Sequence, residues 1–310
     1  MTQNEFRRRR RQLMRIMGRG SIAIIPAAPQ CTRNNDVHYR YRPDSDFYYL
    51  TGFPEPEAVA VLIPGREQGE YILFCREKDP KKERWDGTIA GQEGAVETYG
   101  ADDSFPVSDL DDILPRMLEQ CDKVFYAMGS DTELDQRMSQ WIGRIRGKAR
   151  SGVHPPQEFV ALDHHLHDMR LYKSRSEVAV MRRAAKISAA AHRELMRSCR
   201  PGMKEYDLEG LFIHACYRRG AREQAYQPIV GGGDNATILH YVNNDQLLND
   251  GDLVLVDAGC ELEYYASDIT RTFPVNGRFR EPQRQLYQLV LDAQLAAIKQ
   301  VKPGNPYNAP

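Results

Sequence analysis

The order of helix and strand patterns changes near residue 155, and this change limits the possible folds more than any other feature. Before it, amphipathic helical stretches alternate with short apolar runs that are typical of buried strands. This alternation predicts a compact α/β domain. After it, two helical patterns precede several consecutive strand patterns, and this order predicts an α+β domain with an antiparallel sheet.

The first half of the chain carries its predicted elements in a regular order. Apolar periodicity predicts helices over 5–17, 110–118 and 134–145, and strands over 22–25, 47–50, 58–63, 71–75 and 124–128. Turn residues between 58–63 and 71–75 predict that these two strands form a hairpin. Five consecutive arginines, Arg7 to Arg11, are interpreted as a solvated helix face rather than a binding patch, because the formal net charge is only −1.

The second half begins with a clear helix start. Ser174 and Glu177 form a capping box, and apolar residues then recur at helical spacing until Pro201. The elements predicted after it are a helix over 205–219, strands over 226–230, 237–241, 253–257 and 265–273, and a helix over 282–301. We therefore expect one domain at 1–155, a connector at 156–173 and a second domain at 174–310.

Charge, hydropathy and cysteine spacing exclude several classes of protein. A formal net charge of −1 gives no electrostatic footprint for nucleic acid. The longest strongly apolar stretch, from Ser21 to Pro29, is far shorter than the ~20 residues needed to span a bilayer. The six cysteines form no CxxC pair and are interpreted as free thiols of a reducing compartment. We expect a cytoplasmic protein that binds neither nucleic acid nor membrane.

The most informative local feature is a pair of aspartates in two apolar strand patterns. If the hairpin loop centres near Leu262 and Glu263, Asp257 lies directly opposite Asp268, with Cβ atoms about 4.5–5.5 Å apart. Two carboxylates so close in an apolar strand pair need a shared proton or a cation between them. The alternative is that both are strand-end aspartates bonded to the backbone. Spacing alone leaves both interpretations open.

Other candidate groups carry weaker signals. His240 is a lone histidine on a predicted strand, a pattern more typical of a structural residue than of a ligand. The glycines at 231–233 are followed by neither a Lys-Ser/Thr pair nor a helix, so they predict a hairpin turn rather than a phosphate site. The histidines at 164–167 lie on a predicted connector helix and are not favoured as metal ligands. Cys260 is interpreted as a turn residue.

Three long segments resemble one known family. They are DAGCELEYYASDITRTFPVNGRF at 257–279, with ILHY at 238–241; RYRPDSDFYYLTGFPEPEAVAVLIPG at 40–65; and HDMRLYKSRSEVAVMRRAAKISAAAH at 167–192. They resemble the bacterial Xaa-Pro aminopeptidases (aminopeptidase P) of the creatinase/aminopeptidase superfamily. The resemblance implies an α/β N-terminal domain followed by an α+β pita-bread domain, of which only the first half is present here.

The resemblance also implies a chemistry. Family members are dinuclear Mn²⁺ enzymes that remove the first residue from peptides with proline in second position, by attack of a metal-bridging hydroxide. In the family pattern the position of Asp257 binds one ion and that of Asp268 bridges both. The position of His240 contacts substrate near the scissile bond. A loop that bears Trp85 is implied to lie near the substrate of a neighbouring subunit, and this implies a homo-oligomer.

One departure from the family pattern affects the expected activity. Family members continue beyond this point and supply a histidine and two glutamates to the metals, whereas here no histidine follows His240. We therefore expect these 310 residues alone to be inactive. Two alternatives are a prolidase-like dipeptidase, which shares the aspartate motif, and a non-catalytic pseudoenzyme or binding module that retains the fold.

Overall fold

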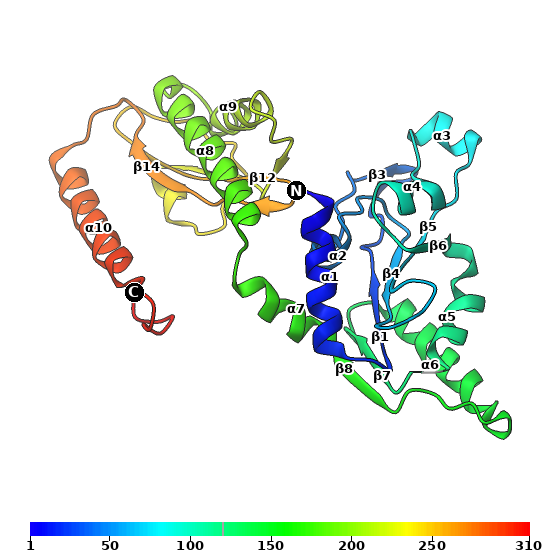
Figure 1. Cartoon of the computed structure of the whole chain (residues 1–310). Coiled ribbons are helices and arrows are strands. Elements are labelled where there is room, and N and C mark those ends of the chain that lie inside the picture. Colours follow the sequence, from blue (N-terminus) through cyan, green and yellow to red (C-terminus); the bar gives the residue numbers. More distant parts are fainter. Residues whose placement is uncertain (120) are drawn as a thin grey trace. The chain divides into compact units, whose positions relative to one another are not determined.

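The computed structural model describes residues 1–119 and 121–310. They form two compact units, Met1–Ser174 and Arg175–Pro310 (Figure 1). The segment 156–173, predicted as a connector, contains strand β8 (Glu158–Ala161) and helix α7 (Leu162–Leu171), both within the first unit. No helix in these described ranges is both long and apolar enough to cross a membrane.

A six-stranded mixed sheet forms the centre of the first unit, in the order β6-β5-β4-β1-β7-β8. Its strands, besides β8, are β1 (Ser21–Pro26), β4 (Val59–Leu62), β5 (Tyr71–Cys75), β6 (Asp103–Pro106) and β7 (Lys123–Tyr126). The predicted β4–β5 hairpin is confirmed, and β1, β7 and β8 run parallel to one another. A separate small hairpin consists of β2 (Thr32–Asn34) and β3 (Val37–His38).

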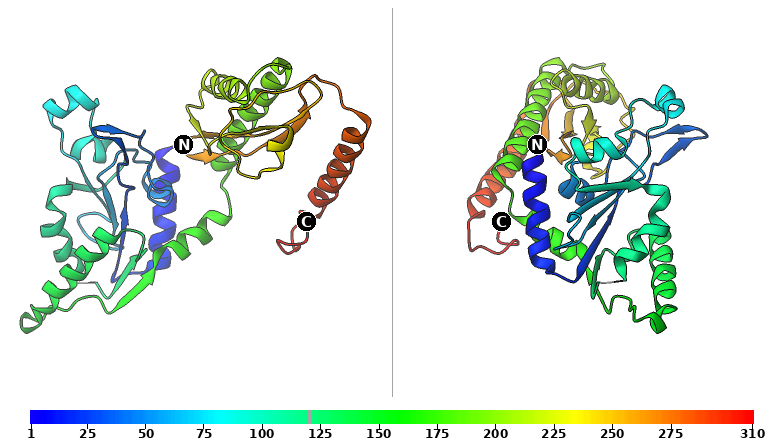
Figure 2. Two further views of the ribbon diagram at one scale, coloured as in Figure 1. Left: turned by 180° about the vertical axis from the view of Figure 1, so that it is seen from behind. Right: turned by 45° about the vertical axis from the view of Figure 1, so that its right-hand side comes forward.

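Helices cover both faces of this sheet, as the views in Figure 2 show. The helices are α1 (Gln3–Met17), α2 (Ser45–Thr51), α3 (Pro80–Asp86), α4 (Gly91–Glu97), α5 (Leu110–Leu118), α6 (Thr132–Arg146) and α7, with short 3-10 turns η1 (Val107–Asp109) and η2 (Ala149–Ser151). Along β1, Ala23 and Ile25 pack with α1, α2, α4 and α7, whereas Ile22 and Ile24 pack with α5 and α6. The strand is apolar throughout because both of its faces are buried.

The prediction of a strand over 47–50 was wrong. These residues belong to helix α2, which begins after Asp44 and ends at Gly52. The Asp44 carboxylate accepts hydrogen bonds from the backbone N–H groups of Asp46 and Phe47, at 2.9 and 2.8 Å, and so caps the helix. Gly52 has the left-handed φ of 65° that ends a helix at glycine. In so short an element the apolar run Phe-Tyr-Tyr-Leu does not separate helix from strand.

The arginine run is only partly the predicted solvated face, because Arg7, Arg8 and Arg11 are exposed but the other two arginines are buried. Arg9 and Arg10 are 0% and 3% exposed. Their guanidinium groups donate to the carbonyls of Tyr49 and Leu50, at 3.0 and 2.9 Å, and these are orphan carbonyls of the last turn of α2. Each guanidinium also lies over an aromatic ring, Arg9 at 4.1 Å from the centroid of Tyr49. The two arginines therefore fasten α1 to the C-terminal end of α2.

Replacing Arg9 by alanine should destabilise the first unit by about 2–4 kcal/mol, because a charged hydrogen bond and a buried cation–π contact are lost together. Arg11→Ala is the matched control, since Arg11 is exposed on the same helix, and should change stability by no more than about 0.5 kcal/mol. Urea unfolding followed by the emission of the buried Trp141 measures both variants. Equal urea midpoints for Arg9→Ala and Arg11→Ala would contradict the conclusion that Arg9 stabilises the packing of α1 on α2.

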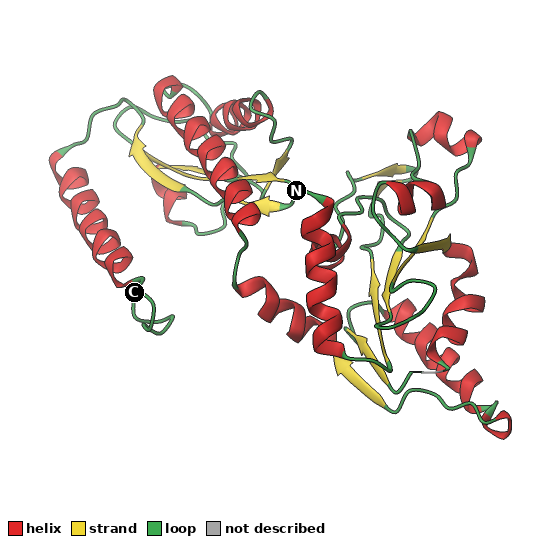
Figure 3. Cartoon of the chain, in the orientation of Figure 1, coloured by secondary structure: helices red, strands yellow, loops and turns green. Residues whose placement is uncertain are grey.

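The second unit packs helices against a twisted hairpin (Figure 3). Its elements are α8 (Arg175–Ser198), α9 (Glu205–Tyr217), β9 (Glu223–Gln224), β10 (Ile229–Gly232), the 3-10 turn η3 (Gly233–Thr237), β11 (Leu253–Asp257), β12 (Cys260–Leu262), β13 (Tyr265–Ala266), β14 (Thr270–Pro274) and α10 (Glu281–Gln300). The strands form two three-stranded groups, β10-β11-β14 and β13-β12-β9, all antiparallel. Helix α8 packs against β12 and β13, and α9 packs against β10.

The register of the long hairpin differs from the predicted one by two residues. Asp257 pairs with Thr270, not with Asp268. The turn residues are Glu263 and Tyr264, which both have positive φ (50° and 64°), as a type I′ hairpin turn requires. Neither residue is the glycine or asparagine that normally signals this turn, so the loop centre was misplaced. Because the shift is even, both aspartates still belong to the same face of the hairpin.

Candidate metal centre

The two aspartates flank the interruption in the middle of the hairpin. Asp257 is the last residue of β11 and is half-buried, whereas the exposed Asp268 lies between β13 and β14. Because Asp257 is opposite Thr270, Asp268 is its diagonal neighbour across the strand pair. The structure therefore brings the two predicted carboxylates together, in a diagonal rather than a direct pairing.

A tyrosine hydroxyl joins the two carboxylates. Tyr226 precedes β10, and its Oη donates to Oδ1 of Asp257 and lies 3.0 Å from Oδ1 of Asp268. Burial, and then the hydrogen bond to Asp257, raise the pKa of Tyr226 well above its ordinary value of 10, so the hydroxyl remains a donor at neutral pH. This one contact shows that oxygens of both aspartates converge on a common point.

Close approach of the two strands depends on Gly259. A Cβ at this position would stand 1.7 Å from the carbonyl oxygen of Ser267 and 3.1 Å from the backbone nitrogen of Asp268. Only glycine leaves the space that the opposite backbone occupies. The residue after it, Cys260, was predicted to lie in a turn, but it begins β12 and is fully buried.

A strand was predicted over 237–241, but the structure has a loop there, and this loop carries His240. It begins with the 3-10 turn η3, which also replaces the hairpin turn predicted from the glycines. His240 follows this turn and is exposed. It belongs to the same unit as the aspartates, but no hydrogen bond of the described residues joins it to them. Its proposed contact with substrate stays a prediction.

A buried carboxylate organises this loop. Glu205, the first residue of α9, is 0% exposed. It accepts hydrogen bonds from the backbone N–H groups of Gly232 and Gln246, at 2.8 and 3.0 Å, and from the Tyr241 hydroxyl at 2.8 Å. The side-chain amide of Asn235 adds a contact of 3.1 Å. Both ends of the segment that bears His240 are thereby tied to one side chain.

A second buried residue ties the loop to β10. Asn244 is 0% exposed and has a left-handed φ of 50°, which asparagine tolerates better than most residues. Its side-chain carbonyl accepts from the Val230 N–H, while its amide donates to the Pro228 carbonyl and to Glu209, all at 2.9 Å. These bonds replace the strand ladder that the sequence pattern predicted here.

The remaining sequence candidates lie in the first unit. Trp85 is on α3 and is 88% exposed, as a residue available to another molecule would be. On α7, Nε2 of His167 lies 3.5 Å from Asp46 and Nε2 of His164 lies 3.9 Å from Asp168. Among the described residues no group of three or more His, Cys, Asp or Glu side chains is arranged to hold a metal ion.

The donor chemistry of the aspartate pair fits a hard divalent cation, although the number of donors is small. Carboxylate oxygens are ligands that Mn²⁺ and Mg²⁺ accept. Two carboxylates whose oxygens contact one hydroxyl can bind such an ion from one side. A full set of ligands requires donors beyond the two aspartates, such as water or other protein groups.

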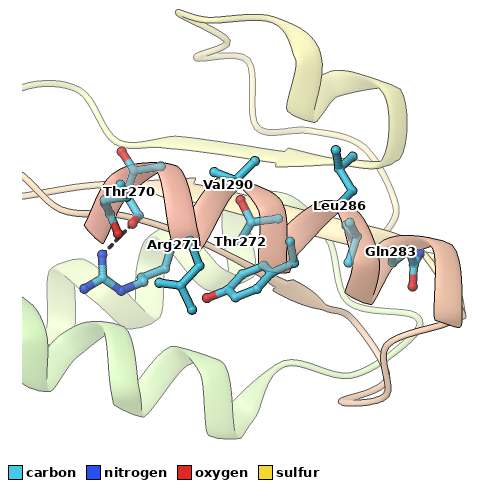
Figure 4. A pocket seen from close by; sticks show the side chains of 10 residues that line it. Thr270, Arg271, Thr272, Gln283, Leu286 and Val290 are labelled. Carbon is cyan, nitrogen blue, oxygen red and sulfur yellow. Dashed lines mark hydrogen bonds between the residues drawn. The ribbon is translucent and has the colours of Figure 1, made fainter. Parts of the chain in front are cut away.

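A cavity of about 410 Å³ lies beside this face of the hairpin. Helix α10 forms one wall through Leu286 and Val290, and β14 forms the other through Thr270 and Thr272 (Figure 4). Thr270 is the register partner of Asp257, so the cavity begins at the residue pair that contains this aspartate. An apolar wall next to an acidic centre can accommodate a small apolar group of a ligand.

Sequence reasoning did not identify Tyr226, Glu205 or Asn244 as site residues. Tyr226 was predicted only as the start of a strand. Glu205 carried one signal, because a carboxylate at a helix start is favoured by the helix dipole. The contacts of all three depend on which strands pair, and local spacing does not contain that information.

Both halves of the chain match known families. Residues 6–126 match the aminopeptidase P N-terminal domain, and residues 179–309 match metallopeptidase family M24. The chain is 44% identical to the Xaa-Pro aminopeptidase of Escherichia coli K12, over 98% of this chain and 69% of that protein. It is 34% identical to human Xaa-Pro aminopeptidase 3, over 98% of this chain and 62% of that protein.

Solved structures give the same result. The structure of Pseudomonas aeruginosa aminopeptidase PepP matches all of this chain and 70% of its own, with a TM-score of 0.98 and 57% identity. The zinc-substituted E. coli aminopeptidase P in complex with product matches with a TM-score of 0.95 over 98% of this chain and 69% of its own.

Proposed function

Since the chain belongs to the aminopeptidase P family of M24 metallopeptidases, we propose that Asp257 and Asp268 are its metal ligands and that the resident ion is Mn²⁺. The observation that carries this proposal is the Tyr226 hydroxyl, which contacts an oxygen of each carboxylate. The family is a metallopeptidase family, and hard carboxylate donors suit Mn²⁺. Two ions per complete site follow from the family pattern.

The reaction is hydrolysis of the bond between a first residue and a proline in second position. When bound, the divalent ion supplies a Lewis acid that polarises the scissile carbonyl and activates water. Asp257 and Asp268 supply anionic oxygens, and Tyr226 fixes the orientation of both carboxylates. His240 contacts the peptide near the scissile bond, where a proton must reach the leaving proline nitrogen.

Three further assignments complete the proposal. The substrates are proline-containing peptides, as the name of the E. coli relative indicates. The protein acts in the cytoplasm, which the free cysteines support. It assembles as a homo-oligomer in which the exposed Trp85 of one subunit contacts substrate bound to another.

Metal titration tests the ligand assignment directly. We expect the 310-residue chain to bind one Mn²⁺ weakly, because two carboxylates converge and the described residues hold no group of three or more metal-ligating side chains. Asp257→Asn or Asp268→Asn should lower the affinity further, by about 10-fold or more. Isothermal titration calorimetry and the EPR signal of free Mn²⁺ measure both effects.

Asp250→Asn provides the matched control. Asp250 is an exposed aspartate of the same unit, and it accepts a hydrogen bond from Asn276 at 2.8 Å that asparagine can retain. The affinity of the Asp250→Asn variant for Mn²⁺ should equal that of the parent chain. Two tight sites on the parent, or equal losses in the control, would contradict the assignment of Asp257 and Asp268.

A further inference from the structure

Helix α8 turns two polar side chains toward the interior of the second unit. Ser188 and His192 lie one helical turn apart on its buried face and are 0% and 2% exposed. The rest of that face is mostly apolar, including Val180, Ala184 and Leu195. Buried polar groups cost free energy unless they are hydrogen-bonded, so the partners of these two residues indicate their role.

The partners of Ser188 are residues of the two aspartate-bearing segments. Its Oγ accepts a hydrogen bond from the Cys260 N–H at 3.0 Å and lies 2.8 Å from Oγ of Ser267. The Ser267 hydroxyl donates to the Cys260 carbonyl at 2.9 Å. The Ser188 hydroxyl must then donate to Ser267, and the three groups form a closed circuit. Ser267 directly precedes Asp268, and Cys260 is three residues after Asp257.

His192 holds the other side of the same junction. Its Nε2 lies 2.9 Å from the carbonyl oxygen of Ala258, the residue after Asp257. Since a carbonyl can only accept, Nε2 carries the proton. The ring also packs edge-on against Phe212 of α9, with centroids 5.3 Å apart, so its orientation is fixed from two sides.

The ladder of the hairpin is only partly formed at this junction. Residues 258–259 and 267–269 lie outside the strands, between the two three-stranded groups. The backbone bonds that remain there are Ala258 N–H to Ile269 at 3.2 Å and Ser267 N–H to Cys260 at 3.0 Å. Two other backbone groups of this junction, the Cys260 N–H and the Ala258 carbonyl, bond to side chains of α8.

We propose that Ser188 and His192 are positioning residues that set the spacing between Asp257 and Asp268, and through it the affinity for the divalent ion. The metal part of this statement rests on the proposed function. The geometric part does not, because the Tyr226 hydroxyl reports the spacing without any metal. No hydrogen bond of the described residues joins either side chain to an aspartate, and their hydrogen bonds reach the aspartates through Ala258, Cys260 and Ser267.

A first measurement uses the metal-free 310-residue chain. The ¹³Cζ NMR signal of Tyr226, assigned with Tyr226→Phe, depends on the hydrogen bonds of its hydroxyl. Ser188→Ala and His192→Leu should move this signal toward the value of free tyrosine. His192→Gln has an amide N–H donor in place of Nε2–H. Its Tyr226 signal should therefore lie closer to the parent value than that of His192→Leu.

A control variant separates positioning from general stability. Leu195→Ala removes a fully buried side chain from the same face of α8 and should lower the urea midpoint at least as much as Ser188→Ala. Leu195 is apolar and cannot form hydrogen bonds to the junction. Its variant should therefore leave the Tyr226 signal at the parent value.

A second measurement adds Mn²⁺ and follows the EPR signal of the free ion. Ser188→Ala and His192→Leu should each raise the dissociation constant about 10-fold, as loss of an outer-shell partner does, whereas Leu195→Ala and His192→Gln should not. If Ser188→Ala and His192→Leu leave the Tyr226 signal unchanged, or if Leu195→Ala moves it equally, the proposal is overturned. If the parent binds no Mn²⁺, the proposed function fails, and the Tyr226 signal still decides the positioning role.

Discussion

The 310-residue chain is expected to release no measurable amino acid from an Xaa-Pro-Xaa tripeptide supplied with Mn²⁺. Hydrolysis needs a polarised carbonyl, activated water and a proton for the leaving nitrogen. The described residues supply two carboxylates and His240, but no group of three metal-ligating side chains. Each missing ligand or partner typically costs 10–100-fold in affinity or activity. The losses multiply to a rate below detection.

A chimera turns this negative result into a positive test. The chain is joined to the part of the E. coli relative that lies C-terminal to the matched region, and the fusion should release the first residue. Asp268→Asn in the fusion should lower kcat/KM by more than about 100-fold. Asp250→Asn, a surface change in the same unit, should leave it near the parent value.

Two results would contradict this account of the site. Robust turnover by the unfused chain, lost on Asp257→Asn, would show that other residues complete the metal set. An active fusion that tolerates Asp268→Asn would show that the second aspartate is not a ligand. Measuring the free first residue by chromatography distinguishes both from background peptide breakdown.

Gly259→Ala should be the most damaging small substitution in the second unit. The added Cβ would stand 1.7 Å from a backbone oxygen, and the two hairpin strands must separate to admit it. We expect a loss of about 3 kcal/mol, the upper end for overpacking, together with loss of the Tyr226 contact to the aspartates. Hydrogen exchange over 253–274, followed by mass spectrometry, measures the local effect.

Gly210→Ala is the matched control for this substitution. Gly210 lies in α9, and a Cβ there would meet no heavy atom within 4 Å. Alanine should stabilise this helix by up to about 1 kcal/mol relative to glycine. Equal protection from exchange in Gly259→Ala and in the parent would contradict the close approach of the two strands.

The family and the fold class of both domains could be predicted from the sequence, and the matched families confirm them. Long elements with strong periodicity were also predictable. The helix over 110–118 is α5, and the strand over 71–75 is β5. Both elements are bounded by turn residues or polar residues, and their apolar residues are buried in the core. The local sequence pattern and the burial therefore agree.

The errors have distinct physical causes. The register of the hairpin was wrong because Glu263 and Tyr264 adopt left-handed backbone angles without the residues that normally signal them. The strand predicted over 237–241 was wrong because Glu205, distant in sequence, accepts hydrogen bonds from Gly232 and Tyr241 on either side of this loop. Arg9 was misjudged because its carbonyl partner lies in another helix. The first of these errors is local to the turn, and the other two depend on contacts between segments distant in sequence.

Part of the candidate site could be predicted from the sequence, and part could not. That Asp257 and Asp268 meet could be predicted from two apolar strands joined by a short loop. That Tyr226 lies across them could not, because it comes from a third segment whose pairing is set only in the folded unit. Their roles as metal ligands, and those of His240 and Trp85 toward substrate, stay predictions.

The network around Glu205 has a consequence for how a peptide would be bound. A loop loses conformational entropy either when the protein folds or when a ligand arrives. Gly232, Tyr241 and Gln246 are already tied to one buried carboxylate, so the segment that carries His240 has lost most of its freedom before any encounter. Binding of a peptide then orders little additional backbone. Less of the free energy of its contacts with the loop is spent on ordering, and more contributes to affinity.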